Sequence, residues 1–305
     1  MEKASVILNL LTEHRKEIQM GNIISSFKHL FKTQKSSEQY YEAMNTDITG
    51  LGGHNSKCWM NVGYWEKAEY YNDANEALAD KLAEFCHFSS GSNLLDVGCG
   101  CGEQDFYWKK CFPQLNIHAM DITPLHIKIA KKRAETEKSN IRFAVGNACD
   151  LGFENETFDR VAALDCAYHF DPREQFMHEA FRVLKKGGYY SASEMLPIKG
   201  EEIMQNQQIK GRKGLFIPDA NMYTIEQYKA KLEKAGFVDV KYEAVGHIVY
   251  KGLAMYFLTR YLHFRKPIEK VRVKFNHNKW QEIFVGMFDF LYGTQEYYFI
   301  SARKP

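Results

Sequence analysis

Apolar residues in the middle of the chain form short runs that alternate with stretches of helical spacing. The short apolar runs predict five strands, at 93–97, 117–120, 141–145, 158–164 and 189–194. The helical spacing predicts helices at about 73–86, 124–138 and 171–186, the last of which ends at two glycines. Alternating strands and helices favour a mostly parallel sheet with helices on both faces. The pattern therefore predicts an α/β protein with a doubly wound sheet.

The two ends of the chain are less regular. Loosely spaced apolar residues up to about residue 45 predict a helical N-terminal extension over 1–71, which could act as a lid. Residues 195–222 interrupt the alternation, and a helix at about 224–235 follows them. Two further strands, at 238–244 and 297–302, bring the sheet to seven. We therefore expect one domain over 72–305, with a helical insertion at about 246–293 whose apolar segments are 252–266 and 279–291.

Composition places the chain among ordinary soluble proteins. Its 305 residues are 45% hydrophobic and 26% charged, which excludes a fibrous or disordered chain. Forty basic and 38 acidic residues leave a net charge of +2, so no nucleic-acid partner is expected. An odd number of cysteines, seven, at irregular spacing favours a reducing compartment, and we expect a cytoplasmic protein. No apolar run is long enough to cross a membrane.

A glycine-rich turn, LLDVGCGCG at 94–102, carries the clearest chemical signal. It lies where a strand meets a helix, so its backbone can approach a ligand at the helix N-terminus. A dinucleotide site requires G-x-G-x-x-G, whereas the glycines here are Gly98, Gly100 and Gly102, preceded by Asp96. A carboxylate at that position suits a cation such as S-adenosylmethionine, which carries a sulfonium and an ammonium. The alternative is a plain strand-to-helix turn. The C-x-C spacing lacks a second cysteine pair, so no metal is expected.

Two later strand ends carry further candidate ligand contacts. Asp121 ends the second strand, 25 residues after Asp96, where a carboxylate can accept both hydroxyls of a ribose; it could instead cap the next helix. Ile122 would then lie against an adenine ring. Asn147 and the backbone of Ala148 follow the third strand and could bind the adenine edge, although Asn147 could also be a turn residue.

Four segments in this order resemble the class I S-adenosylmethionine-dependent methyltransferases: 94–102, AMDIT at 119–123, 146–161, and VLKKGGYYSASEM at 183–195. The resemblance implies a Rossmann-like methyltransferase fold, S-adenosylmethionine as cofactor, and an antiparallel last strand. The segments NVGYW at 61–65 and AYHF at 167–170 are similar to the small-molecule group that methylates macrolide sugars, sterols and tocopherol-type rings. One departure is Asn147, where the family more often has Asp. The cofactor contacts implied are Tyr41, Trp65, Asp96, Gly98, Gly100, Gln104, Asp121, Ile122, Asn147, Ala148 and Asp165.

The end of the fourth strand supplies the candidates for chemistry. His169 is a candidate general base, because a neutral imidazole is available near pH 7 to take a hydroxyl proton. It could instead order the loop before Asp171, and carbon or nitrogen acceptors might need no strong base. Asp165 is expected to contact the cofactor ammonium. Tyr64 and Tyr168 are the expected substrate contacts.

Aromatic residues concentrate at the C-terminus. Residues 246–305 contain 14 aromatics, with ten Lys or Arg against four Asp or Glu, so this part is basic and the remainder acidic. Three interpretations are open: a lid over a lipophilic acceptor, a helix in peripheral contact with a membrane, and a structural cap or homodimer surface. The favoured function is methylation of a small hydrophobic, ring-bearing acceptor, at a hydroxyl. The alternatives are a lipid methyltransferase and a catalytically silent scaffold that binds the cofactor.

Overall fold

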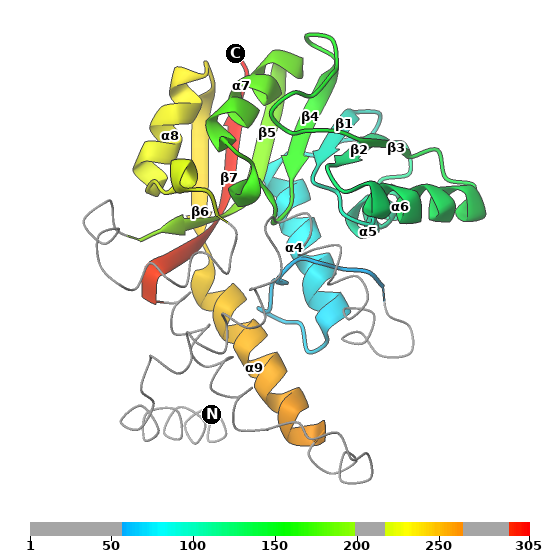
Figure 1. Ribbon diagram of the computed structural model, residues 1–305, viewed down its shortest axis with the longest axis vertical. Coiled ribbons are helices and arrows are strands. Elements are labelled where there is room, and N and C mark those ends of the chain that lie inside the picture. Colours follow the sequence, from blue (N-terminus) through cyan, green and yellow to red (C-terminus); the bar gives the residue numbers. More distant parts are fainter. Residues whose placement is uncertain (1–56, 199–216, 265–292) are drawn as a thin grey trace.

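A computed structural model describes residues 57–198, 217–264 and 293–305, with side chains in the long helix at 246–264 described up to residue 256 (Figure 1). Most of the predicted N-terminal extension, with Tyr41, lies outside the described residues. So does the helix predicted at 279–291. The part of the extension that is described, residues 57–70, is not helical.

The centre of the molecule is a seven-stranded sheet of order β3-β2-β1-β4-β5-β7-β6. Its first five strands are parallel, and β7 runs antiparallel between β5 and β6. This confirms the doubly wound sheet and the antiparallel last strand. The strands are β1 Asn93–Val97, β2 Asn116–Asp121, β3 Arg142–Val145, β4 Phe158–Ala163, β5 Leu184–Pro197, β6 Val238–Ala244 and β7 Gln295–Arg303.

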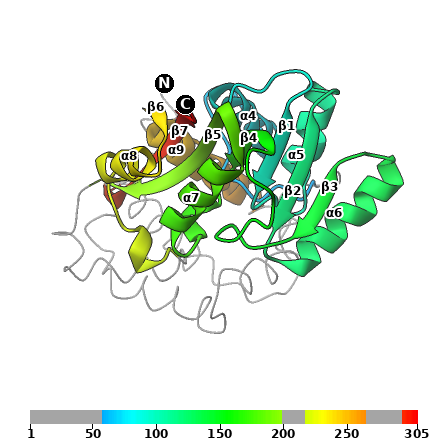
Figure 2. The ribbon, with the colours of Figure 1, turned by 90° about the horizontal axis from the view of Figure 1, so that it is seen from above.

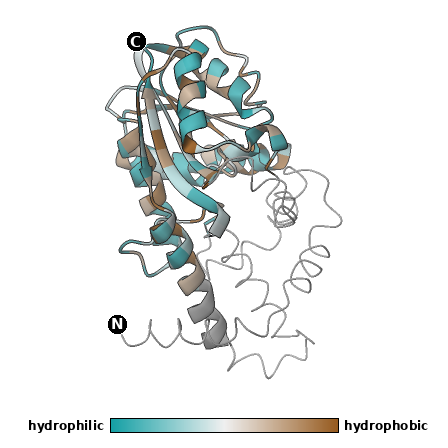
Figure 3. Ribbon diagram, turned by 90° about the vertical axis from the view of Figure 1, so that its left-hand side faces the viewer, coloured by the Kyte–Doolittle hydropathy of each residue, from teal (hydrophilic) through white to brown (hydrophobic). Residues whose placement is uncertain are grey.

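Helices cover both faces of this sheet. The buried side chains form two core clusters, one on each face of the sheet. Those of α4, α5 and α6 belong to one cluster, and those of α7 and α8 belong to the other. Figure 2 shows α4 and α5 on one side of the sheet and α7 on the other. Hydrophilic and hydrophobic residues alternate along these helices, as expected for helices with one buried face (Figure 3). Their bounds are α4 Tyr71–Phe85, α5 Glu103–Cys111, α6 Pro124–Glu137, α7 Arg173–Val183 and α8 Ile225–Lys234.

Most predicted bounds agree with the structure to within two residues, but the junction of α7 and β5 does not. The helix ends at Val183, and the strand begins at Leu184, five residues before the predicted start. Leu184 is fully buried and pairs with Phe158 of β4, so burial of its side chain turns the backbone into the sheet. The glycines at 187 and 188 therefore lie inside the strand and do not end the helix.

The C-terminal insertion begins with α9, Gly246–Phe264, which starts six residues earlier than the predicted apolar segment. It follows β6 directly and therefore begins at the edge of the sheet where the parallel strands end. From there it projects away from the sheet (Figures 1 and 3). At Gly252 an added Cβ would lie 2.0 Å from Cβ of Trp65, so the helix is closely packed against the segment before α4. None of the helices within the described ranges combines the length and the hydropathy of a membrane span.

Candidate functional site

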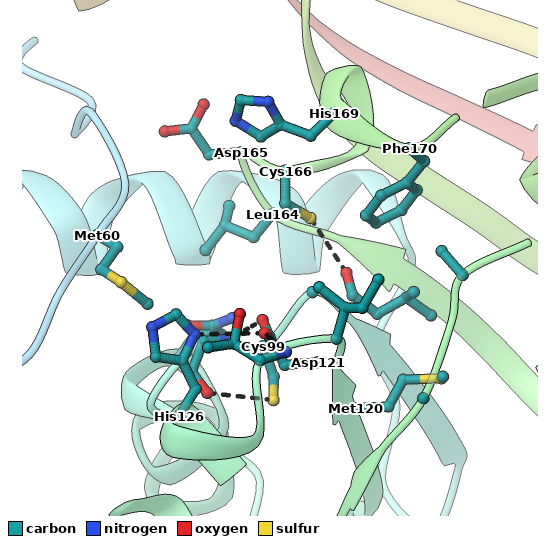
Figure 4. Close-up of a pocket in the computed structure, with 18 of the residues that line it drawn as sticks. Met60, Cys99, Met120, Asp121, His126, Leu164, Asp165, Cys166, His169 and Phe170 are labelled. Atoms are coloured by element: carbon teal, nitrogen blue, oxygen red, sulfur yellow. Dashed lines mark hydrogen bonds and ion pairs between the residues drawn. The ribbon is translucent and has the colours of Figure 1, made fainter. Parts of the chain in front are cut away.

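A cavity of about 300 Å³ opens at the carboxyl ends of β1, β2 and β4, where ligands bind in open α/β sheets (Figure 4). Figure 4 shows Asp121 and His126 at one end of it and Asp165 and His169 at the other. Three carboxylates line the cavity, from Asp121, Asp165 and Asp171, and the described lining contains neither Lys nor Arg. That charge distribution opposes a pyrophosphate and favours a cationic ligand.

The glycine turn forms the floor of the cavity. Gly98, Gly100 and Gly102 have φ of +81°, +55° and +81°, values that residues other than glycine rarely adopt. Gly102 is the N-cap of α5, so that helix presents its free N–H groups toward the turn. An added Cβ at Gly100 would lie 2.0 Å from Cε of Met60, so a side chain there would have to displace the methionine.

Asp96 lies behind the turn and does not line the cavity. Its carboxylate is fully buried and accepts a hydrogen bond from Nε2 of Gln104 at 3.0 Å, and Gln104 does line the cavity. Burial raises the pKa of Asp96 to about 7 despite that hydrogen bond. Gln104, with its N–H group held by Asp96, can turn its carbonyl oxygen toward a ligand.

Asp105, on the first turn of α5, is a second fully buried acid beside Asp96. Neither of its oxygens, nor Oδ1 of Asp96, has a hydrogen-bond donor within the described chain. Burial and the charge of Asp96 raise the pKa of Asp105 well above its usual value. The two carboxyls can satisfy each other by sharing a proton.

Asp121 is held at the end of β2 by three groups. Its carboxylate accepts the N–H groups of Gly100 at 2.9 Å and Thr123 at 2.8 Å, and lies 3.3 Å from Nδ1 of His126. Burial alone would raise the pKa of Asp121, but these partners outweigh it and lower the pKa. The residue is therefore a fixed anion at one end of the cavity.

The expected adenine-binding residues lie beside Asp121. Ile122, Asn147 and Ala148 all line the cavity, and Ile122 is 53% exposed in the absence of a ligand. Oδ1 of Asn147 accepts the N–H of Cys149 at 2.9 Å, which closes the turn after β3. Asn147 thus combines the turn role with a position in the cavity lining, and its contact with adenine stays a prediction.

Residues 57–65, the cover segment, close one side of the cavity. Cys58, Met60 and Asn61 line it. The N–H of Cys58 donates to Oε1 of Glu103 at 2.9 Å, and the N–H of Val62 to Oδ2 of Asp165 at 2.8 Å. The cover segment therefore spans from the start of α5 to the end of β4.

Asp165 anchors this segment and lines the cavity. Besides Val62, its carboxylate accepts the hydroxyls of Tyr297 at 3.0 Å and Tyr168 at 3.2 Å. Burial raises the pKa of Asp165 to about 6, against the effect of these donors. Tyr168 is thus buried against Asp165. A substrate contact was expected to line the cavity, and Tyr168 is not among the lining residues.

His169 lies on the short helix Ala167–His169 after β4, half-buried, and lines the cavity next to Asp165. Trp65 and Tyr64 are not in the cavity lining. The indole of Trp65 donates to the carbonyl of Val62 and packs 4.9 Å from the ring of Tyr256, while Tyr64 packs edge-on against Phe299. These two residues and Tyr168 support the walls of the cavity from behind, and their expected ligand contacts stay predictions.

Several lining residues have no counterpart in the sequence-based prediction. Met60 adjoins one marked segment and Phe170 lies within another, but an apolar side chain beside a motif carries no signal of its facing a ligand. His126 lies on α6, where helical spacing predicts burial, and its contact with Asp121 gives no sequence pattern. Pairs of this kind appear only when the strand ends are placed in space.

The cavity fits S-adenosylmethionine in its donors and acceptors. A fixed carboxylate lies at the expected ribose position, the expected adenine contacts lie beside it, and backbone without side chains forms the floor. The acidic lining matches the positive charge of the sulfonium and the ammonium.

Comparison with known proteins agrees with this geometry. A family model described as "Methyltransferase domain" matches residues 95–192. Erythromycin 3''-O-methyltransferase of Saccharopolyspora erythraea is 37% identical over 212 residues, which cover 67% of this chain and 69% of the relative. 27-O-demethylrifamycin SV methyltransferase of Amycolatopsis mediterranei is 26% identical over 64% of this chain and 71% of its own length.

Solved structures share the fold at lower identity. The cyclase SpnF superimposes with a TM-score of 0.67 at 20% identity, over 88% of this chain and 96% of its own. A phosphoethanolamine N-methyltransferase of Haemonchus contortus, solved with S-adenosylhomocysteine, gives a TM-score of 0.64 at 20% identity, over 92% of this chain and 60% of its own. At this level of identity the likeness concerns the fold, since one fold supports several chemistries.

Proposed function

The chain belongs to the S-adenosylmethionine-dependent methyltransferases, and we propose that it methylates a hydroxyl group on a small, hydrophobic, ring-bearing acceptor. The observation that carries the proposal is the position of His169, which lines the cavity at the end opposite Asp121. If Asp121 holds the ribose, the reactive part of the cofactor extends toward His169. An acceptor hydroxyl placed at this end of the cavity would lie within reach of both the methyl group of the cofactor and His169.

Each end of the cavity has residues suited to one part of the cofactor. Asp121 would accept the ribose hydroxyls, and Ile122, Asn147 and Ala148 would surround the adenine. Gln104, held by Asp96, would turn its carbonyl oxygen toward the ammonium. When bound, the cofactor supplies a methyl group made electrophilic by the sulfonium charge. The protein's own part is to bind, to orient and to exclude water from this site.

His169 would take the proton of the acceptor hydroxyl. A neutral imidazole is suited to that task near pH 7, because one of its ring nitrogens can accept a proton, and contributions of 10²–10⁴-fold are typical of general bases. Asp165, which Figure 4 shows beside His169, would stabilise the imidazolium that results. Its oxygens are held by Val62, Tyr168 and Tyr297, so the carboxylate keeps its place as the charge on the imidazole changes.

The acceptor class rests on two observations. The relative at 37% identity is named for O-methylation of erythromycin. The described wall near His169 is largely apolar, with Leu164, Cys166 and Phe170. A macrolide glycoside with a free sugar hydroxyl fits both, because it combines an apolar ring with a hydroxyl that requires a base.

A screen of hydroxylated macrolides, terpenoids and phenols with S-adenosylmethionine labelled at the methyl carbon tests the proposal. We expect the label in an acid-stable ether on the acceptor, and a loss of turnover of at least 100-fold in His169→Ala with unchanged affinity for S-adenosylhomocysteine. His178→Ala, an exposed histidine on α7 outside the cavity lining, is the matched control. Transfer to carbon or nitrogen, or full turnover in His169→Ala, would contradict the proposed base.

A further inference from the structure

A cluster of buried polar residues lies directly behind the loop that carries His169, outside the cavity. We call Arg173, Glu194, Asn221, Tyr223 and Tyr228 the Arg173 network. Arg173 and Glu194 are 0% exposed and Asn221 is 1% exposed. A buried ion pair is a poor device for stability, because its desolvation penalty cancels much of the attraction. The network therefore calls for an explanation beyond stability.

Asn221 contacts the backbone on both sides of His169. Its Nδ2 donates to the carbonyl of Tyr168 at 3.1 Å and to the carbonyl of Phe170 at 2.5 Å. Its Oδ1 accepts the N–H of Arg173 at 2.9 Å. The amide thus uses both donors and its acceptor, and the reversed orientation would set its oxygen against two carbonyls. This one side chain therefore holds the peptide plane between residues 168 and 169, which adjoins His169, and the plane between residues 170 and 171.

Arg173 holds Asn221 in turn. Its Nη2 donates to the carbonyl of Asn221 at 2.8 Å, its Nε to the hydroxyl of Tyr223 at 2.6 Å, and its Nη1 to Oε2 of Glu194 at 2.6 Å. Tyr228 donates to the other oxygen of Glu194 at 3.0 Å. The guanidinium is thereby bound in a fixed orientation between strand β5 and the short helix Asp219–Asn221.

We propose that Asn221, supported by Arg173, is a positioning residue that fixes His169 toward the cavity; the proposal rests on the proposed function of His169. A catalytic side chain must be held to about half an ångström, which requires that its supporting groups be locked themselves. His169 is the last residue of a short one-turn helix, which has few backbone hydrogen bonds of its own. Asn221 adds a restraint from a segment far along the chain.

Hydrogen exchange is the deciding measurement. Asn221→Asp keeps the shape and the acceptor for Arg173 but removes both donors, and Asn221→Ala removes the whole amide. We expect the amides of residues 166–171 to exchange at least tenfold faster in both variants. Ser191→Ala is the matched control, because Ser191 is fully buried and also donates to a backbone carbonyl, that of Ile300 at 2.7 Å, but lies in the sheet. We expect Ser191→Ala to leave the exchange rates of the amides of residues 166–171 unchanged.

Turnover on a macrolide glycoside with a free sugar hydroxyl provides the second readout. We expect Asn221→Asp to turn over at least tenfold more slowly, with affinity for S-adenosylhomocysteine within twofold of the wild type. The double variant with His169→Ala should be no slower than His169→Ala alone, because Asn221 acts through His169. Unchanged exchange of 166–171 in the Asn221 variants, or wild-type turnover in Asn221→Asp, overturns the inference. Failure of the proposed base shows separately, as full turnover in His169→Ala.

Discussion

Asp105→Asn removes one of two buried carboxyls beneath the glycine turn without changing the shape of the side chain. In the wild type both acids are fully buried, and the raised pKa of Asp105 lets the folded state hold a proton at pH values where the unfolded chain has already lost it. In the unfolded chain Asp105 ionises near its ordinary pKa of about 4. The folded state therefore binds one proton more than the unfolded state, and its stability falls as the pH rises.

The size of the effect follows from that single proton. One extra proton in the folded state corresponds to about 1.4 kcal/mol of stability per pH unit. Between pH 5.5 and 7.5 the contribution of Asp105 is thus a loss of up to about 3 kcal/mol. Asparagine carries no such penalty, and its amide can donate to Oδ1 of Asp96, which has no donor in the described chain. The variant is expected to gain stability over the wild type as the pH rises.

Urea denaturation at pH 5.5, 6.5 and 7.5 measures this difference, with equal m-values as the check that the two folded states are alike. The free energies of unfolding of wild type and Asp105→Asn should diverge by about 1.4 kcal/mol per pH unit. Glu135→Gln, an exposed acid on α6, is the control and should follow the wild type. Parallel pH dependences for wild type and Asp105→Asn would refute the shared proton.

Three further variants test the site and its support. Gly100→Ala places a side chain at a φ of +55° and 2.0 Å from Met60, so calorimetry should show at least tenfold weaker binding of S-adenosylhomocysteine, and unchanged affinity would contradict the close approach at the turn. Asp121→Asn replaces charge-assisted hydrogen bonds worth roughly 1.5–3 kcal/mol each, so the same titration should show about 100-fold weaker binding, and a loss under threefold would remove Asp121 from the ribose site. Arg173→Met leaves Glu194 buried without its cation, which should lower the free energy of unfolding by about 3–5 kcal/mol, and an unchanged urea midpoint would show the pair to be dispensable.

The sheet could be predicted because the central strands β1 and β4 are buried on both faces along much of their length, and each strand between 93 and 164 is followed by a turn or a helix. Burial on both faces produces continuous apolar runs, such as Val161 to Leu164, which differ clearly from the helical spacing beside them. The boundary between α7 and β5 was predicted wrongly because the local sequence does not distinguish the two elements there. Arg182 to Lys186 fits a helix and a strand equally well, and only the pairing of Leu184 with Phe158 decides between them.

The place of the glycine turn and of Asp121 in the cavity lining could be predicted as well, because both carry a local sequence signal. Backbone approach requires glycine, and a ribose requires an acid at a strand end, so both leave residue types at fixed spacing. The placement of Asp96 could not be predicted. Whether its carboxylate meets the ligand or stands behind Gln104 depends on the helix that follows, and both arrangements have the same sequence pattern.

Support of the loop that carries His169 leaves no pattern of this kind. Asn221 binds two backbone carbonyls, and every residue has a carbonyl, so nothing about Tyr168 or Phe170 identifies a partner. Arg173 would be assigned to an exposed helix start from its charge, yet it is fully buried. Motifs therefore identify the residues that meet a ligand, whereas the residues that hold those in place become visible only with the fold. For this chain the difference separates His169, which the sequence proposes, from Asn221, which only the structure can propose.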